Sequence, residues 1–133
     1  MTNVIFEENE NHFKASVTGH SGYGPAGADI VCAAVSMLAA TLIQAALEAW
    51  GMLEAVETLN ERDGDVCLDI TTTDAGRGHM HSVFHAILCG YKLLEKKYPQ
   101  CVAVGRKSAC ASAMVGVRAK MPTPMMADTS QRR

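Results

Sequence analysis

The sequence shows none of the features that direct a protein out of the cytoplasm or into a membrane. Its N-terminus has no basic region followed by an apolar one, so no secretory signal is visible. No stretch reaches the roughly 18 uninterrupted apolar residues that a membrane span needs. The nearest one, residues 30–47, is interrupted by Ser36, Thr41 and Gln44 and predicts a buried helix. We therefore expect a cytoplasmic protein with no membrane partner.

The cysteines lack the pattern of a disulfide framework. There are five, an odd number, at irregular spacings and without a Cys-x-x-Cys pair. In a chain without a secretory signal this pattern favours reduced thiols, most of them buried as small apolar side chains. We expect no cofactor, and we treat one of the thiols as a candidate for reactivity.

The charge is unevenly distributed along the chain. Residues 1–104 carry six Lys and Arg against thirteen Asp and Glu, whereas residues 105–133 carry six against one. An acidic body favours encounter with a basic partner. The basic C-terminal stretch has no aromatic residues on which bases would stack. We therefore expect no direct binding of nucleic acid.

Periodicity and turn signals predict a single α/β (α+β) domain over residues 1–106, followed by a loosely ordered tail at 107–133. The order ββ-α-ββ-α-β implies a mixed or antiparallel sheet with two main helices packed on it. Gly51 is expected to close the first helix, and Pro99 to stop the second. The expected strands are residues 4–6, 13–17, 53–59, 66–70 and 101–104, and the expected helices are residues 30–50 and 80–97.

A glycine-rich segment precedes the first helix. Residues 19–27 hold four glycines and a proline, so this segment cannot be regular structure, and we expect it to be mobile. Asp29 follows as a good N-cap for the helix. The glycines of the predicted mobile loop are Gly19, Gly22, Gly24 and Gly27.

Cys32 and His20 lie at the two ends of this segment and have the chemistry of a nucleophile and its base. A helix N-terminus and a nearby imidazolium both lower the pKa of a cysteine, and Cys32 would be the third residue of the helix. The imidazole of His20 can take a proton and return it to a leaving amine. The competing interpretation is that Cys32 merely packs in the core and that His20 lies on the surface.

Two further residues have open roles. Asp29 either caps the helix, with a charge that opposes formation of a thiolate at Cys32, or orients His20 as the third member of a triad. Ser36 lies one turn after Cys32 on the same helix face. Its hydroxyl either contributes to the site or bonds back to the helix backbone.

The segments Gly-His-Ser-Gly-Tyr at 19–23 and Gly-Ala-Asp-Ile-Val-Cys-Ala at 27–33 resemble the signature of the ribosomal-processing cysteine proteases, the Prp family. The resemblance extends over the order of elements to about residue 105. It implies a dyad of Cys32 and His20 under a mobile loop. It also implies a homodimer that removes the N-terminal extension of large-subunit ribosomal protein twenty-seven. Ser21 stands where the family usually has Ala, and the tail has no counterpart.

Three other functions compete with proteolysis. The side chains of His79, His81, His85 and Cys89 suggest zinc, but three ligands spread over about 12 Å of one helix cannot hold one ion, so we expect no metal there. Thiol redox chemistry at Cys32 lacks a resolving cysteine nearby in sequence. The main alternative is a non-enzymatic module that binds or helps to assemble the ribosome.

Overall fold

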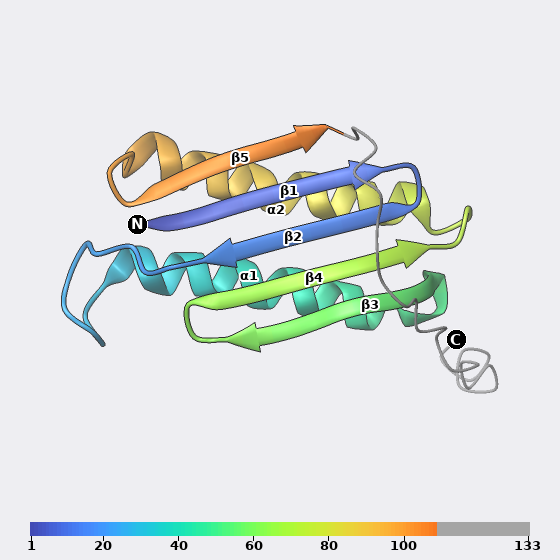
Figure 1. Ribbon diagram of the computed structural model, residues 1–133, viewed down its shortest axis with the longest axis horizontal. Coiled ribbons are helices and arrows are strands. Elements are labelled where there is room, and N and C mark those ends of the chain that lie inside the picture. Colours follow the sequence, from blue (N-terminus) through green and yellow to red (C-terminus); the bar gives the residue numbers. More distant parts are fainter. Residues whose placement is uncertain (109–133) are drawn as a thin grey trace.

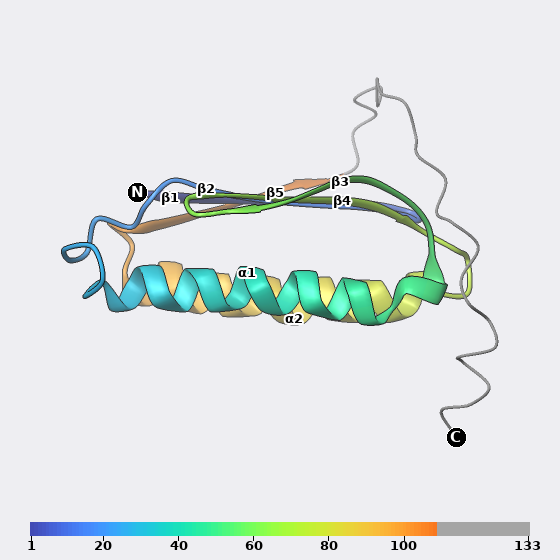
Figure 2. The ribbon, with the colours of Figure 1, turned by 90° about the horizontal axis from the view of Figure 1, so that it is seen from below.

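The computed structural model describes residues 1–108 as one sheet of five strands with two long helices on one of its faces (Figure 1). Seen edge-on, the helices form a single layer beneath the sheet, and no helix among residues 1–108 covers the other face (Figure 2). The main elements are β1 (Thr2–Asn9), β2 (His12–Thr18), α1 (Ile30–Glu48), β3 (Leu53–Arg62), β4 (Asp65–Thr72), α2 (Arg77–Lys97) and β5 (Val102–Ser108).

The sheet is mixed, with the strand order β3-β4-β2-β1-β5. Its first four strands pair antiparallel, and β5 pairs parallel with β1 along its whole length. The predicted ββ-α-ββ-α-β order, single domain and mixed sheet are confirmed. Because α1 carries the chain from β2 across β4 to β3, the end of β2, the start of α1 and the β3–β4 turn lie at the same end of the sheet (Figure 1).

The core lies between the sheet and the helices. On β2 every second side chain, Phe13, Ala15 and Val17, is buried, as expected of a strand with one covered face. The ring of Phe13 packs against Phe84 of α2 at a centroid distance of 5.1 Å. This alternation fixes the register, because a shift of one residue would turn the apolar side chains outward.

The two helices approach each other closely. A side chain at Gly90 of α2 would place its Cβ 2.8 Å from a terminal methyl of Leu38 of α1, so the Leu38 side chain would have to shift. Tyr91, buried beside it, donates a hydrogen bond to the Val35 carbonyl at 3.0 Å. By length and composition α1 is the one helix among residues 1–108 that meets the requirements for crossing a membrane. In this fold its buried residues, including Val35, pack into the core.

Some boundaries differ from those expected. The helix α1 ends at Glu48, and a 3-10 turn over Trp50–Met52 follows, because the Ala49 amide is shared between the carbonyls of Ala45 and Ala46. Gly51 therefore lies inside this turn and does not cap the helix. The helix α2 begins at Arg77, three residues before the expected start at residue 80, and β5 continues to Ser108, four residues beyond its expected end. The tail from residue 109 and Cys110 lie outside the described residues.

Candidate functional site

His20, Cys32 and Ser36 line one pocket of about 180 Å³ at the end of the sheet where β2 stops. Its walls come from the end of β2 and the start of the glycine-rich segment, from the first three turns of α1 and from the β3–β4 hairpin. The fold thus brings together the three side chains that the sequence suggested. Cys32 is half-buried, whereas His20 and Ser36 are exposed.

Cys32 is held at the first turn of α1 by Asp29. The Cys32 amide donates to Asp29 Oδ1 at 2.9 Å, and the Ala33 amide donates to the Asp29 carbonyl at 3.1 Å. Asp29 thus caps the helix, as its position suggested. The cap fixes the backbone of Cys32 in the turn where unpaired amides concentrate positive potential.

His20 is positioned by contact with Gly64, which lies 44 residues later in the sequence. The Gly19 amide donates to the Gly64 carbonyl at 2.9 Å, which ties the end of β2 to the β3–β4 turn. A Cβ atom built on Gly64 would lie 2.7 Å from His20 Nε2 and 2.9 Å from Cε1. Gly64 has a φ of 74°, a conformation that side chains rarely adopt. The imidazole therefore rests against a position where only glycine leaves room for it.

The second carboxylate oxygen of Asp29 holds the glycine-rich segment. Asp29 Oδ2 accepts hydrogen bonds from the Ser21 hydroxyl at 2.5 Å and from the amides of Tyr23 at 3.0 Å and Gly24 at 3.2 Å. Within residues 1–108 no hydrogen bond joins Asp29 to His20. Asp29 therefore acts on the helix and the loop in this structure, and its contacts do not support the triad interpretation.

These hydrogen bonds lower the pKa of Asp29 from 3.8 to about 2, with the Ser21 hydroxyl as the largest cause. Ser21, at the position where the resembled family has Ala, is buried and turned toward this carboxylate. This contact could not be predicted from the sequence, because a serine eight residues before an N-cap has no fixed spatial relation to it.

We expect the loop to keep its contacts down to low pH. Because the pKa of Asp29 in the folded state is below its unfolded value of 3.8, the carboxylate's stabilisation is fully present above that pH and is lost as the pH falls through about 2. The amide shifts of Tyr23 and Gly24, followed by NMR during acid titration, should report this midpoint. In Ser21→Ala the midpoint should rise toward 3.8; an unchanged midpoint would contradict the assignment of the hydroxyl.

The loop also rests on the end of α2. The ring of Tyr23, half-exposed, meets the ring of Tyr98 edge-on at a centroid distance of 5.2 Å. Tyr98 directly follows the last turn of the helix. The loop is thus held by one aromatic contact and the hydrogen bonds of Asp29, while its predicted mobility remains a prediction.

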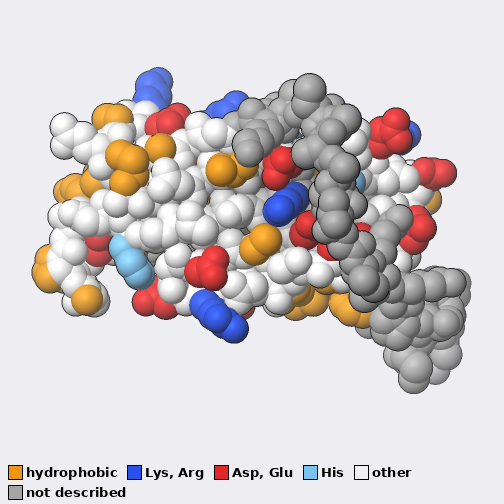
Figure 3. Space-filling view, viewed as in Figure 1, with side chains coloured by type: hydrophobic (Ala, Val, Ile, Leu, Met, Phe, Trp, Pro, Cys, Tyr) orange, Lys and Arg blue, Asp and Glu red, His pale blue; other side chains and the backbone are white. Residues whose placement is uncertain are grey.

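Charged side chains lie on the surface around the β3–β4 turn (Figure 3), and some of those on the hairpin line the pocket. Three carboxylates and one guanidinium from this hairpin line it: Glu61, Asp63, Asp65 and Arg62. The sequence predicted the hairpin but not its place in the site, because the contact between the hairpin and the His20 loop is long-range. The pocket wall is therefore predominantly acidic.

The other histidines and cysteines that suggested metal or redox chemistry lie apart from this pocket. His81 Nδ1 pairs with Glu8 Oε2 at 2.6 Å, and His85 lies 3.7 Å from the Cys89 sulfur on the same helix face. All four cysteines within residues 1–108 are free thiols. Burial raises the pKa of Cys67, which keeps that thiol protonated.

Two comparisons with known proteins match the chain over most of its length. The family model described as cysteine protease Prp matches residues 1–103. The crystal structure of SMU.848 from Streptococcus mutans is 28% identical, covers 81% of this chain and 95% of its own, and has a TM-score of 0.61. No curated protein sequence matches the chain.

The fold is also that of the essential ribosomal processing protease Prp from Staphylococcus aureus. Its complex with a covalently linked product peptide is 22% identical, covers 80% of this chain and 100% of its own, and has a TM-score of 0.59. Its complex with a substrate peptide is 19% identical, with the same coverage and a TM-score of 0.54. At these identities the likeness carries the fold alone.

Proposed function

The chain belongs to the Prp family of cysteine proteases, and we propose that Cys32 is its nucleophile and His20 the general base of its dyad. The observation that carries this proposal is the single pocket that both side chains line, with Cys32 in the first turn of α1. Family membership favours the enzyme over the non-enzymatic ribosome-binding module.

The reaction follows from the chemistry of the two groups. His20 takes the thiol proton, and the sulfur attacks the carbonyl carbon of the scissile peptide bond. The imidazolium then gives the proton to the leaving amine as the acyl-enzyme forms. Water, deprotonated by His20, then attacks the acyl carbon. The carbon–sulfur bond breaks, the new carboxyl group is released, and the imidazolium returns its proton to the sulfur, which restores the Cys32 thiol and neutral His20.

The start of α1 offers stabilisation for the oxyanion of the tetrahedral intermediates. The first amides of a helix have no carbonyl of an earlier turn to bond to. The Asp29 side chain accepts from the Cys32 amide, whereas the amides of Ile30 and Val31 have no hydrogen-bond partner within residues 1–108. Amides at a helix N-terminus favour negative charge. We propose that they contribute to an oxyanion hole, while Ser36 lines the pocket one turn further along.

For the substrate we propose the N-terminal extension of large-subunit ribosomal protein twenty-seven, processed in the cytoplasm during ribosome assembly. The support is the family and the charge of the pocket wall, whose carboxylates Glu61, Asp63 and Asp65 suit a basic chain. The same surface is unfavourable to phosphates, so we propose no direct binding of nucleic acid.

The test is cleavage of this ribosomal protein with its extension present, followed by mass spectrometry of the new N-terminus. We expect a single cut at the extension, and a kcat/KM that falls several-fold as salt rises from about 0.05 to 0.5 M, because salt screens the attraction. Asp63→Asn should lower the rate and flatten the salt dependence. Lack of cleavage, or equal cleavage of the protein without its extension, would refute the proposed substrate.

We also propose that the protein is a homodimer. The support from the structure is the apolar surface of the two helices, where Ile30, Met37 and Leu93 are each more than half exposed. Large apolar side chains gathered on a helix layer are typical of surfaces that meet a partner. Sedimentation equilibrium at micromolar concentration should give twice the chain mass; a monomer mass would contradict this assignment.

A further inference from the structure

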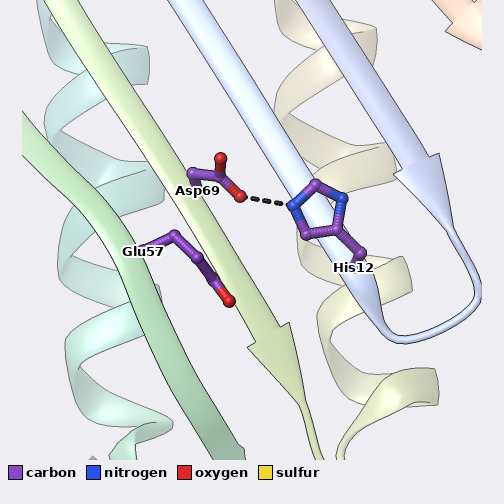
Figure 4. Close-up of side chains that lie close together, drawn as sticks. All are labelled: His12, Glu57 and Asp69. Carbon is purple, nitrogen blue, oxygen red and sulfur yellow. Dashed lines mark hydrogen bonds and ion pairs between the residues drawn. The ribbon is translucent and has the colours of Figure 1, made fainter. Parts of the chain in front are cut away.

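Three side chains with metal-binding atoms come together on the sheet face that no helix covers within residues 1–108. They are His12 on β2, Glu57 on β3 and Asp69 on β4, three neighbouring strands (Figure 4). One donor atom from each lies within 4.8 Å of the other two. None of the three lines the pocket of Cys32 and His20.

The backbone builds this cluster in two ways. The β2–β4 register pairs His12 with Thr71 and Lys14 with Asp69, so His12 and Asp69 are diagonal neighbours on the same face. The β3–β4 register shifts between Val56 and Thr58, which makes Glu57 the extra residue of a β-bulge. Such bulges turn a side chain to a new direction, and here the carboxylate turns toward the other two.

Hydrogen bonds hold the side chains of the cluster in position. Asp69 is almost fully buried, and its Oδ1 is hydrogen-bonded to His12 Nε2. Glu57 Oε1 accepts a hydrogen bond from the Thr71 hydroxyl at 3.1 Å, which orients it as outer groups orient metal ligands. Two carboxylates this close repel each other, and a cation between them offsets the repulsion. Lys14, opposite Asp69 in register, is the side chain that competes for this role.

We propose that His12, Glu57 and Asp69 bind a divalent transition-metal ion, with zinc as the ion of best fit. Zinc takes nitrogen and oxygen ligands at about 2.0–2.2 Å in tetrahedral geometry, so donors around one ion lie roughly 3.3–3.6 Å apart, a distance that rotations of these side chains can reach. Neutral imidazole favours zinc over magnesium or calcium, which prefer more oxygen ligands. On binding, the ion replaces the hydrogen bond between His12 and Asp69, and water completes the coordination.

The ion would act on stability and not on the peptidase reaction. His12 is the first residue of β2, and Thr18, just before the His20 loop, is its last. The six residue-to-residue steps between them span about 20 Å. One ion would join β2, β4 and β3, and it would thereby hold the hairpin that forms the acidic wall of the pocket.

The test is thermal unfolding of the full chain with and without zinc at pH 7.5. At an ion concentration about tenfold above Kd, the Tm of the wild-type protein should rise by roughly 5 °C, and magnesium at the same concentration should not change it. Asp69→Asn and Glu57→Gln keep the shape of the side chains and should lose the rise. His85→Gln is the matched control and should retain it.

A second measurement identifies the ligand directly. In long-range proton–nitrogen NMR spectra the ring signals of His12 should move on addition of zinc, while those of His81 and His85 stay unchanged. The proposal is overturned if millimolar zinc leaves Tm unchanged, if both carboxamide variants keep the full rise while folding normally, or if only the histidines of α2 or His20 respond.

Discussion

Cys32→Ala is expected to lower kcat/KM for peptide cleavage by at least about 10³-fold, because the reaction then has no atom to carry the acyl group. His20→Ala should lower it by about 10²- to 10⁴-fold, the range that a positioned general base contributes. Because both groups act in one step, the double variant should be little worse than Cys32→Ala alone. The measurement is cleavage of a peptide that spans the junction between extension and mature protein.

The matched control removes a different thiol. Cys89→Ala takes away an exposed sulfur on α2, outside the pocket, and should leave kcat/KM unchanged. A covalent adduct between Cys32 and substrate, trapped by acid quench and found by mass spectrometry, should be absent in Cys32→Ala. Wild-type rates in Cys32→Ala or His20→Ala would exclude the proposed dyad.

Gly64→Ala is expected to reduce kcat/KM by about 10²-fold with only a small loss of stability. The added Cβ would lie 2.7 Å from His20 Nε2, so the ring must move. Because His20 is exposed, the ring can rotate away at little cost to folding. Displacement of a catalytic group by about 1 Å is sufficient for a loss of this size. The positive φ adds a strain of about 1 kcal/mol.

The control for this prediction is Gly51→Ala. An alanine Cβ at Gly51 meets no atom within 4 Å, and its φ is not positive, so activity and stability should both remain near wild type. Urea unfolding of Gly64→Ala should show a change in free energy of about 1 kcal/mol. If Gly64→Ala lost both its activity and most of its free energy of unfolding, the substitution would act on the fold and not on His20.

The order of elements was predictable because its signals are local. Alternating burial along β2, the Asp-Gly turn at residue 64 and the N-cap at Asp29 are all readable within a few residues of sequence. The ends of the elements were less predictable. The helix α2 starts three residues earlier than expected. Its residues 77–79 carry no apolar side chain and its N-cap Gly76 makes no side-chain hydrogen bond, so neither periodicity nor a capping residue marks this start in the sequence.

Of the candidate site, only the two chemical groups, Cys32 and His20, were indicated by the sequence. Cys32 owes its place to the local cap, and this could be read from the sequence. The contact of His20 with Gly64 depends on long-range strand pairing, which leaves no local signal. The cluster of His12, Glu57 and Asp69 also depends on long-range strand pairing. The β-bulge at Glu57 could not be predicted, because a polar stretch of strand has no pattern in which an extra residue would be detected.

The two carboxylate oxygens of Asp29 bind different segments, and this bears on the predicted movement of the glycine-rich loop. Oδ1 is bonded to the Cys32 amide, whereas Oδ2 is bonded to Ser21, Tyr23 and Gly24. If a bound peptide detached the loop from Oδ2, Oδ1 would still hold the Cys32 amide. We therefore expect Asp29 to act as a fixed point, so that the predicted movement of the loop leaves the backbone of Cys32 in place.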